Sequence, residues 1–319
     1  MLKRAALRTM AWLTFLTAFW TLVPGQQAQA ALSGDFNYMD NGDGTATITS
    51  YMGTNTDVII PSVLDGLTVT GIGRDAFFAR NLTSVTLPDT LTSIGIRAFG
   101  SNQLTSLTIP DSVMTIGDYA FMSYSLTNLT LSNGLKSIGI YAFFGNKLTN
   151  VIFPEGLERL GRAAFYGNQL THVEFPNSLT SIGNGAFRSN QLIRIKLPNH
   201  LEIMEGYAFA NNDLTSIEIP ESVTSIGEYA FTSNALTQVT ILGDATSIEG
   251  SAFDNNQISP DDLTFISYDP SPAKDYAVAN GHTFHKLMPE LSGLTLSEGS
   301  LSPVFDSGSL AYTVSVTNS

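Results

Sequence analysis

A single unit of 22 residues recurs along most of this 319-residue chain. Its clearest mark is an Ala-Phe pair, and the Phe returns every 22 residues in nine successive copies without a slip. A fixed period in the twenties is typical of a solenoid, in which each copy forms one coil stacked on its neighbours. The repeat therefore constrains the architecture far more than it constrains the binding partner. The nine phenylalanines are Phe77, Phe99, Phe121, Phe143, Phe165, Phe187, Phe209, Phe231 and Phe253.

Within each unit the apolar positions are fixed relative to the Phe. Large apolar side chains stand at +5, +8 and +10, as in Leu82, Val85 and Leu87. The polar residue between +8 and +10 gives an alternation of period two, which predicts a short strand with one face inward. Pro follows at +11 in six of eight copies and ends the strand, because it has no N–H to donate. No window shows a long helical stripe, so we predict a β-rich coil.

Stacking such coils superposes equivalent side chains. We expect the Phe rings to form one internal row and the Asn residues at +3 to form another, whose amides satisfy backbone groups that the turn buries. Tyr124 interrupts the Asn row, so we expect a local defect at 122–126. Gly stands four residues before the Phe in seven of nine copies, with Glu205 and Glu249 in the others. This pattern indicates a tight bend that favours Gly without requiring positive φ everywhere.

The repeated unit, read as L-T-S-L-T-I-P-x-S-V-x-x-I-G-x-x-A-F-x-x-N, resembles the BspA-like leucine-rich repeat of bacterial surface proteins. The resemblance covers about residues 36–288. It implies a right-handed solenoid of the leucine-rich repeat type, with a parallel sheet on the concave side, no catalysis and no cofactor. Members of this family are associated with adhesion and protein binding.

The N-terminus predicts secretion. Lys3, Arg4 and Arg8 precede an apolar run at 10–23, and Ala28-Gln29-Ala30 follows as a small-x-small cleavage site. We predict a signal peptide over residues 1–30, cleaved after Ala30, and no membrane insertion thereafter. A retained membrane anchor is the alternative, although the run is short for a spanning helix.

The net charge of the chain limits the classes of partner it can bind. Removing residues 1–30 takes away three cations and no anions, so the formal charge moves from −13 to −16. An acidic chain argues against nucleic acid and against anionic membrane surfaces as partners. The chain has no Cys, which excludes disulfides and thiolate metal sites, so its stability must come from stacking.

We divide the chain after the signal peptide into an N-terminal β cap (31–66), the repeat solenoid (67–265), a C-terminal helical cap (266–288) and a further segment (289–319). The first cap contains a predicted hairpin that turns near Asn41-Gly42 or Asp43-Gly44. Calcium at Asp40, Asn41 and Asp43 is the weaker interpretation, because their spacing is not that of an EF-hand loop.

The C-terminal cap holds the only convincing helical stretch, 271–281, with Pro272 in its first turn. His282 and His285 follow it, but a metal site would need further ligands, so none is predicted. Residues 291–319 resemble the start of a bacterial cadherin-like β-sandwich, with strands expected at 294–296 and 312–316. About a third of such a domain is present, so we expect a fragment of a longer protein that is poorly packed when alone.

Solvent-facing positions +7 and +9 are the candidate binding surface. Most copies carry Ser, Thr or Asn there, but the middle copies depart from this pattern. Adjacent parallel strands lie about 4.8 Å apart, so the departing side chains should form one mixed-charge patch on the concave sheet. One interpretation is contact with a protein partner, and the other is that the charges neutralise one another and keep the sheet soluble. The patch consists of Asn150, Ile152, His172, Glu174, Arg194, Lys196 and Glu218.

A second, weaker candidate is a lateral patch at position +1. Phe78, Met122, Phe144 and Tyr166 stand there in the early half of the repeat. Four large apolar groups at one lateral position form an interface if they are exposed. Packing against the neighbouring coil is the alternative.

Catalysis lacks support in the sequence, since no nucleophile elbow, phosphate-cradling Gly loop or zinc-binding run occurs. His172 and Glu174 could act as a base and its partner, but such a pair is weak evidence alone. We therefore expect a secreted or cell-surface, non-catalytic scaffold that mediates protein binding or adhesion. The alternatives are a carbohydrate-binding module, which would favour aromatic residues at +7 and +9, and a structural spacer that displays a downstream domain.

Overall fold

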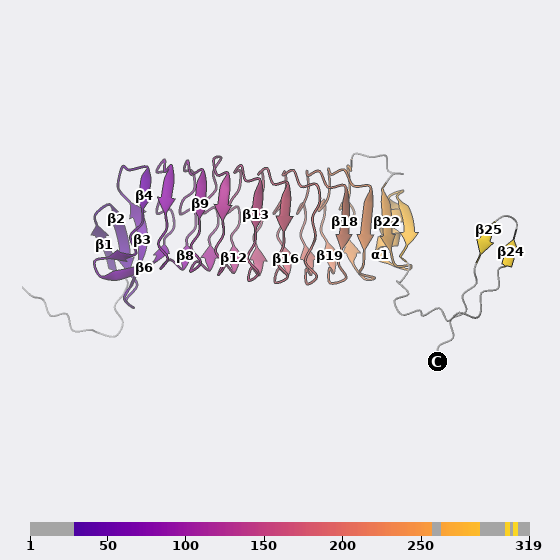
Figure 1. The fold of residues 1–319 in the computed structure, drawn as a ribbon, viewed down its shortest axis with the longest axis horizontal. Helices are drawn as coiled ribbons and strands as arrows, with labels where there is room; N and C mark the ends of the chain where they lie inside the picture. The colour runs from indigo at the N-terminus through magenta and orange to yellow at the C-terminus, as the bar shows by residue number, and fades with distance from the viewer. Residues whose placement is uncertain (1–28, 257–262, 288–303, 307–308, 312–319) are drawn as a thin grey trace, which may run out of the picture.

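Each 22-residue unit forms one coil, and the coils stack side by side in a single column (Figure 1). The computed structural model describes residues 29–256, 263–287, 304–306 and 309–311. The predicted strand alternation is confirmed, because strands such as β13 (Asn150–Ile152) expose their first and last residues and bury the middle one. The chain therefore folds as a β-solenoid with parallel stacking between successive coils.

One side of the column, which we call the strand face, carries the strands that the sequence predicts. Three pairs of neighbouring strands bond in parallel with a register of 22 residues, as in Asn150↔His172: β9 with β11, β13 with β15, and β18 with β20. β7 pairs with β4 (Asp57–Ile59) of the N-terminal end, and residues 194–196 contribute the isolated bridge Glu174↔Lys196. The strands are β7 (Ser84–Thr86), β9 (Ser106–Thr108), β11 (Asn128–Thr130), β13 (Asn150–Ile152), β15 (His172–Glu174), β18 (Ser216–Ile219) and β20 (Gln238–Ile241).

A second side, which we call the ladder face, carries strands that the sequence analysis missed. The Ser-Ile pair of each unit is a two-residue strand, too short to show an alternation of period two. These strands join one 13-stranded sheet that is parallel throughout the repeats. They are β8 (Ser93–Ile94), β10 (Thr115–Ile116), β12 (Ser137–Ile138), β14 (Arg159–Leu160), β16 (Ser181–Ile182), β17 (Ile203–Met204), β19 (Ser225–Ile226) and β21 (Ser247–Ile248).

The Gly after each Ser-Ile pair is needed for close approach, which corrects the tight-bend interpretation. A Cβ on Gly95 would lie 2.7 Å from the carbonyl oxygen of Ile72, and one on Gly161 would lie 2.6 Å from the carbonyl carbon of Gly139. The left-handed residues lie elsewhere in the coil, two before and two after the Phe. Tyr119 (φ 58°) and Ser101 (φ 58°) are examples of these two positions. Gly at this position therefore sets the distance between coils, while the left-handed bends lie elsewhere, on Gly145, Gly167 and Gly185 in some coils and on non-Gly residues in most.

The internal Phe row is confirmed. Successive rings from Phe77 to Phe253 stack with centroids 4.8–5.8 Å apart and planes within 15°. The stack continues into both ends of the column. Tyr51 stacks on Phe77 at 5.5 Å, and Phe265 meets Phe253 edge-on at 5.2 Å.

The Asn row is also confirmed, together with its expected role. The Asn190 Nδ2 donates to the carbonyl oxygens of Phe165 (3.0 Å) and Phe187 (3.1 Å), and its Oδ1 accepts from the Leu170 N–H at 3.0 Å. Each Asn thus satisfies three backbone groups in two coils.

The expected defect at Tyr124 is present. The Tyr124 side chain turns outward and is 71% exposed, so this coil supplies no amide to the row. Ser123 partly compensates, because its buried Oγ donates to the Asn102 carbonyl oxygen at 2.6 Å. In the preceding coil, the Leu82 N–H donates to the Asn102 Oδ1. The equivalent Leu104 N–H has no Asn acceptor, because Tyr124 stands at that position.

At the N-terminal end of the column the sheet of the ladder face continues into longer strands, of which β1–β2–β3 pair antiparallel and β3–β6 pair in parallel. The predicted hairpin is formed by β2 and β3, with Gly42 and Gly44 in the left-handed region of its turn. The carboxylates near the turn bond to backbone, as Asp40 accepts from the Gly42 N–H at 2.8 Å. The strands here are β1 (Gln29–Ser33), β2 (Phe36–Asp40), β3 (Thr45–Tyr51), β4 (Asp57–Ile59), β5 (Val63–Leu64) and β6 (Leu67–Ile72).

The C-terminal end closes with β22 (Thr264–Ser267), the predicted helix α1 (Pro272–Ala279) and β23 (Thr283–Lys286). Ser271 is the N-cap of α1, and the Tyr276 hydroxyl accepts from the Phe253 N–H at 3.3 Å over the last ring. Burial raises the pKa of Tyr276. The domain boundaries at 66, 265 and 288 stay predictions.

Beyond residue 287 only β24 (Val304–Asp306) and β25 (Ser309–Ala311) are described, and they pair antiparallel. The strands expected at 294–296 and 312–316 lie outside the described residues, so the cadherin-like interpretation is not tested. Across the described ranges, no helix is long and apolar enough to cross a bilayer.

Candidate protein-binding face

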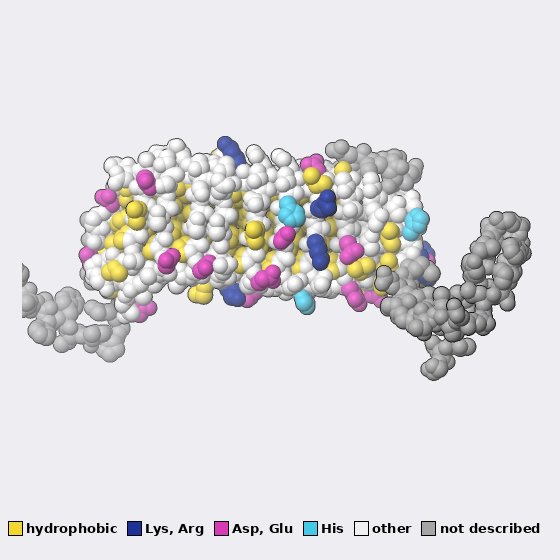
Figure 2. Space-filling model, in the orientation of Figure 1, with side chains coloured by type: hydrophobic (Ala, Val, Ile, Leu, Met, Phe, Trp, Pro, Cys, Tyr) yellow, Lys and Arg dark blue, Asp and Glu magenta, His cyan; other side chains and the backbone are white. Residues whose placement is uncertain are grey.

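The structure places all seven patch residues on the strand face, with their side chains exposed. β13 carries Asn150 and Ile152, β15 carries His172 and Glu174, and β18 carries Glu218. Arg194 and Lys196 lie in the coil between β15 and β18. Figure 2 shows Lys, Arg and His side chains among acidic ones toward the C-terminal half of this view of the column.

The register brings the patch together in two rows along the column. Asn150 lies opposite His172, and Ile152 lies opposite Glu174 on adjacent strands. The bridge between Glu174 and Lys196 continues the second row. The patch is therefore a contiguous surface over four coils, as the sequence predicted from strand spacing.

The charges of the patch are only partly paired. The His172 Nε2 lies 3.3 Å from the Glu174 Oε1, and both side chains are more than half exposed. Arg194 and Lys196 form no ion pair within the described part of the chain, although Glu174 and Glu218 flank them. The exposed cations therefore stay available to an external carboxylate.

A hollow lies beside these cations. It has a volume of about 420 Å³ and is lined by His172, Glu174, Arg194, Lys196 and the turn residues Asn177 and Asn199. Ile152 lies next to it along the row and is 75% exposed, as is Ile59 (74%) at the end of β4. A hollow, an apolar knob and unpaired cations together favour binding of a partner surface.

The lateral patch is half-buried. Phe144 meets Tyr141 and Tyr166 edge-on, at centroid distances of 5.4 and 5.1 Å. The Arg188 guanidinium lies over the rings of Tyr166 (5.5 Å) and Tyr207 (4.9 Å).

Cations continue this lateral packing toward the N-terminal end. The Arg97 guanidinium lies 5.3 Å from the ring centroid of Phe78 and forms an ion pair with Asp75, Nε to Oδ1, at 2.7 Å. The hydrogen bond and the charge of Asp75 raise the pKa of Arg97. The lateral side chains thus bury much of their surface against one another.

The pair His172 and Glu174 lies on an exposed strand, at the wall of the open hollow described above. In the described ranges, no group of three His, Asp or Glu side chains is placed to hold a metal ion. The geometry of the strand face suits surface recognition more than chemistry.

Comparison with known proteins identifies the family. A profile of the BspA type leucine-rich repeat region matches residues 51–171 and 158–267, which together exceed half of the chain. The chain belongs to the BspA type leucine-rich repeat family. No curated protein matches it.

Solved structures agree on the fold. A leucine-rich repeat protein of T. pallidum is 27% identical, with a TM-score of 0.52 over 56% of this chain and 87% of that one. A leucine-rich repeat protein from Bacteroides ovatus is 25% identical, with a TM-score of 0.52 over 77% of this chain and 71% of that one. Family and fold define a repeat scaffold of a kind compatible with protein binding.

Proposed function

We propose that this chain is a secreted or surface-displayed scaffold that binds another protein through the strand-face patch. The observation that carries the proposal is the group of charged side chains in the middle coils, where the other repeats carry mostly Ser, Thr or Asn at +7 and +9. Arg194 and Lys196 are exposed without an ion pair among the described residues, close to the exposed Ile152. A partner with an apolar contact and an acidic group beside it fits this combination, because apolar contact gives affinity and charge sets register.

Secretion rests on the N-terminal pattern, of which residues 1–28 lie outside the described chain. β1 spans Gln29–Ser33, so cleavage after Ala30 would fall inside this strand. The pairs Ala31↔Tyr38, Leu32↔Asn37 and Ser33↔Phe36 would remain, and the β2–β3 hairpin does not depend on the two lost residues. The cap can therefore survive processing at this site.

The lateral patch is the alternative protein-binding surface. Its rings contact one another and neighbouring guanidinium groups, which leaves less apolar area for a partner than an open patch would. The carbohydrate alternative would favour aromatic residues at +7 and +9, where the repeats carry none, although the Tyr124 ring is 71% exposed elsewhere. Tyr119 and Tyr141 cover each other's faces at a centroid distance of 5.2 Å.

Affinity capture with charge-reversed variants tests the proposal. Wild type is compared with the double variant Arg194→Glu/Lys196→Glu for capture of extracellular proteins, and the affinity of each captured protein is then measured. The matched control is Arg159→Glu/Arg162→Glu, which makes the same charge change on the ladder face. We expect the strand-face variant to bind about tenfold more weakly or worse, and the control to bind as wild type. Equal affinity of the strand-face variant and wild type would refute the proposal.

A further inference from the structure

Charge is segregated along the column. Residues 136–196 contain seven Lys or Arg and three Asp or Glu, whereas residues 197–254 contain nine Asp or Glu and no Lys or Arg. On the ladder face the basic part also holds Glu158, whose Oε1 lies 3.8 Å from the Lys136 Nζ, so the cations left there without an acidic partner among the described residues are Arg159 and Arg162. This arrangement was not apparent from the sequence alone, because that face had not been predicted.

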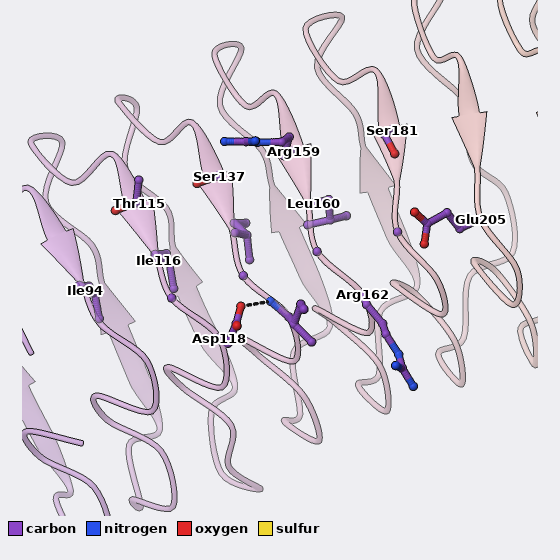
Figure 3. A pocket seen from close by; sticks show the side chains of 16 residues that line it. Ile94, Thr115, Ile116, Asp118, Ser137, Arg159, Leu160, Arg162, Ser181 and Glu205 are labelled. Atoms are coloured by element: carbon purple, nitrogen blue, oxygen red, sulfur yellow. Dashed lines mark hydrogen bonds between the residues drawn. The ribbon is translucent and has the colours of Figure 1, made fainter. Parts of the chain in front are cut away.

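The basic part of this face is the pair Arg159 and Arg162, which we call the basic pair. Both residues are exposed and neither forms an ion pair with a described residue. Arg162 only lies over the Tyr141 ring, at 5.8 Å. Figure 3 shows the two side chains on one coil, leaving toward opposite sides of a shallow groove of about 680 Å³.

The acidic part is a set of four exposed glutamates on the following coils, which we call the acidic cluster. The 22-residue register through β14, β16, β17, β19 and β21 aligns equivalent residues in rows along the column. Arg162 and Glu228 lie in one row, and Gly161 and Glu205 lie in another. Glu205 accepts from the Asn184 N–H at 2.8 Å, but no member has a cationic partner within the described residues. The acidic cluster consists of Glu202, Glu205, Glu228 and Glu249.

The two sets are too far apart to neutralise each other in one molecule. Glu205 lies two coils from Arg162 and Glu249 lies four coils away, which at about 4.8 Å per coil is roughly 10–19 Å. The Debye length at physiological salt is about 8 Å, so each set presents its own field. Between them lies a coil whose ladder-face residues 180–184 carry no charge, and its Ser181 and Gly183 line the groove.

We propose that the ladder face binds the ladder face of a second copy of this chain, in antiparallel orientation. A twofold axis normal to the face, over the coil of Ser181 and Gly183, sets the basic pair of each copy against the acidic cluster of the other. The same rotation exchanges the two edges of the face. Arg162 of one copy, which lies nearest one edge, then meets Glu202 of the other copy, which lies nearest the opposite edge of its coil. One surface thus satisfies both halves of an isologous contact.

The contact is weak and reversible. The charged coils extend over about 25 Å and the strand with its flanks over about 13 Å, which buries roughly 700 Å² in total, below the usual range for stable complexes. The net charge of −13 also opposes association. We therefore expect a dimer at tens to hundreds of micromolar protein, held by direct charge contacts. It leaves the strand face free and does not depend on the proposed partner.

A charge exchange measured by analytical ultracentrifugation tests this dimer. Three forms of the full chain are compared: wild type, Arg159→Glu/Arg162→Glu, and Glu202→Lys/Glu205→Lys, whose two lysines face positions 162 and 159 of the other copy. Wild type should dimerise, and each variant alone should associate about tenfold more weakly or worse, because like charges then meet at both contacts. An equimolar mixture of the two variants should dimerise again, because every contact regains opposite charges.

The strand-face variant Arg194→Glu/Lys196→Glu is the control and should dimerise as wild type. Thermal unfolding of each variant monitors its folding, and recovery in the mixture excludes misfolding as the cause of a loss. A monomeric wild type at several hundred micromolar, a dimer insensitive to both variants, or a mixture that stays monomeric would each overturn the proposal.

Discussion

Each coil buries one Phe ring, and most coils also bury one Asn amide. On the strand face of the same coils, position +7 varies between Ser, Asn, His, Arg and Gln. Interior residues touch their equivalents in the next coil, so a change in one disturbs two neighbours. Strand-face side chains touch solvent. The comparison teaches that the stack can vary its outer wall at little cost in stability, and this separates recognition from folding.

The largest effect should come from the interior Phe row. Phe187→Ala removes a fully buried ring that stacks on Phe165 (5.8 Å) and Phe209 (5.5 Å). We expect unfolding by denaturant to show a loss of about 3–5 kcal/mol. Phe144→Ala, on the half-buried lateral patch, is the control and should cost about 1–2 kcal/mol. Equal losses at both positions would break the distinction between interior and wall.

The spacing between coils gives the next effect. Gly161→Ala would place a Cβ 2.6 Å from the Gly139 carbonyl carbon, so the coils must separate, at a cost of about 1–3 kcal/mol. Gly250 also stands outside the left-handed region but has no atom within 4 Å of a Cβ, and Gly250→Ala should be nearly neutral. Chemical denaturation of the two variants checks the difference, and a neutral Gly161→Ala would contradict it.

The interruption of the Asn row allows a gain of stability. Tyr124→Asn restores an amide that can accept from the Leu104 N–H and donate to the carbonyls of Phe99 and Phe121. We expect a stabilisation of about 1 kcal/mol in thermal or chemical unfolding. Tyr124→Ala removes the same ring without restoring the amide, so it should not stabilise. If both variants change the free energy of unfolding equally, the Asn amides do not stabilise the stack through their backbone hydrogen bonds.

The smallest effect on stability should come from the strand face itself. Arg194→Glu/Lys196→Glu changes two exposed side chains that form no ion pair with described residues. We expect the free energy of unfolding to stay within about 0.5 kcal/mol of wild type. A loss of several kcal/mol would mean that these residues hold the coil together, and their use for recognition would lose its basis.

Much of the interior could be predicted from the sequence, because a fixed period turns a position in the unit into a row in the fold. Phe187, Asn190 and the defect at Tyr124 followed directly from that rule. The ladder face did not, since a strand such as Ser93–Ile94 is too short to carry a periodic signal. The role of Gly161 was also hidden, because its constraint comes from the backbone of another coil.

The candidate site was predictable in location and not in electrostatics. Strand spacing placed His172, Glu174, Arg194 and Lys196 together, and the structure agrees. Sequence could not show that Glu174 approaches His172 while Arg194 and Lys196 form no ion pair with a described residue, because that depends on side-chain conformation. Whether the patch binds a partner stays a proposal.

The most direct test of the account is hydroxyl-radical footprinting of the wild-type chain with and without a captured partner. This method reads side-chain exposure on each surface in one experiment: Ile152 and His172 on the strand face, Met122 and Tyr166 on the lateral patch, and Met114 beside the ladder face. We expect the partner to protect Ile152 and His172 and to leave the other three unchanged. Protection confined to the lateral patch or to Met114 would contradict the assignment of recognition to the strand face.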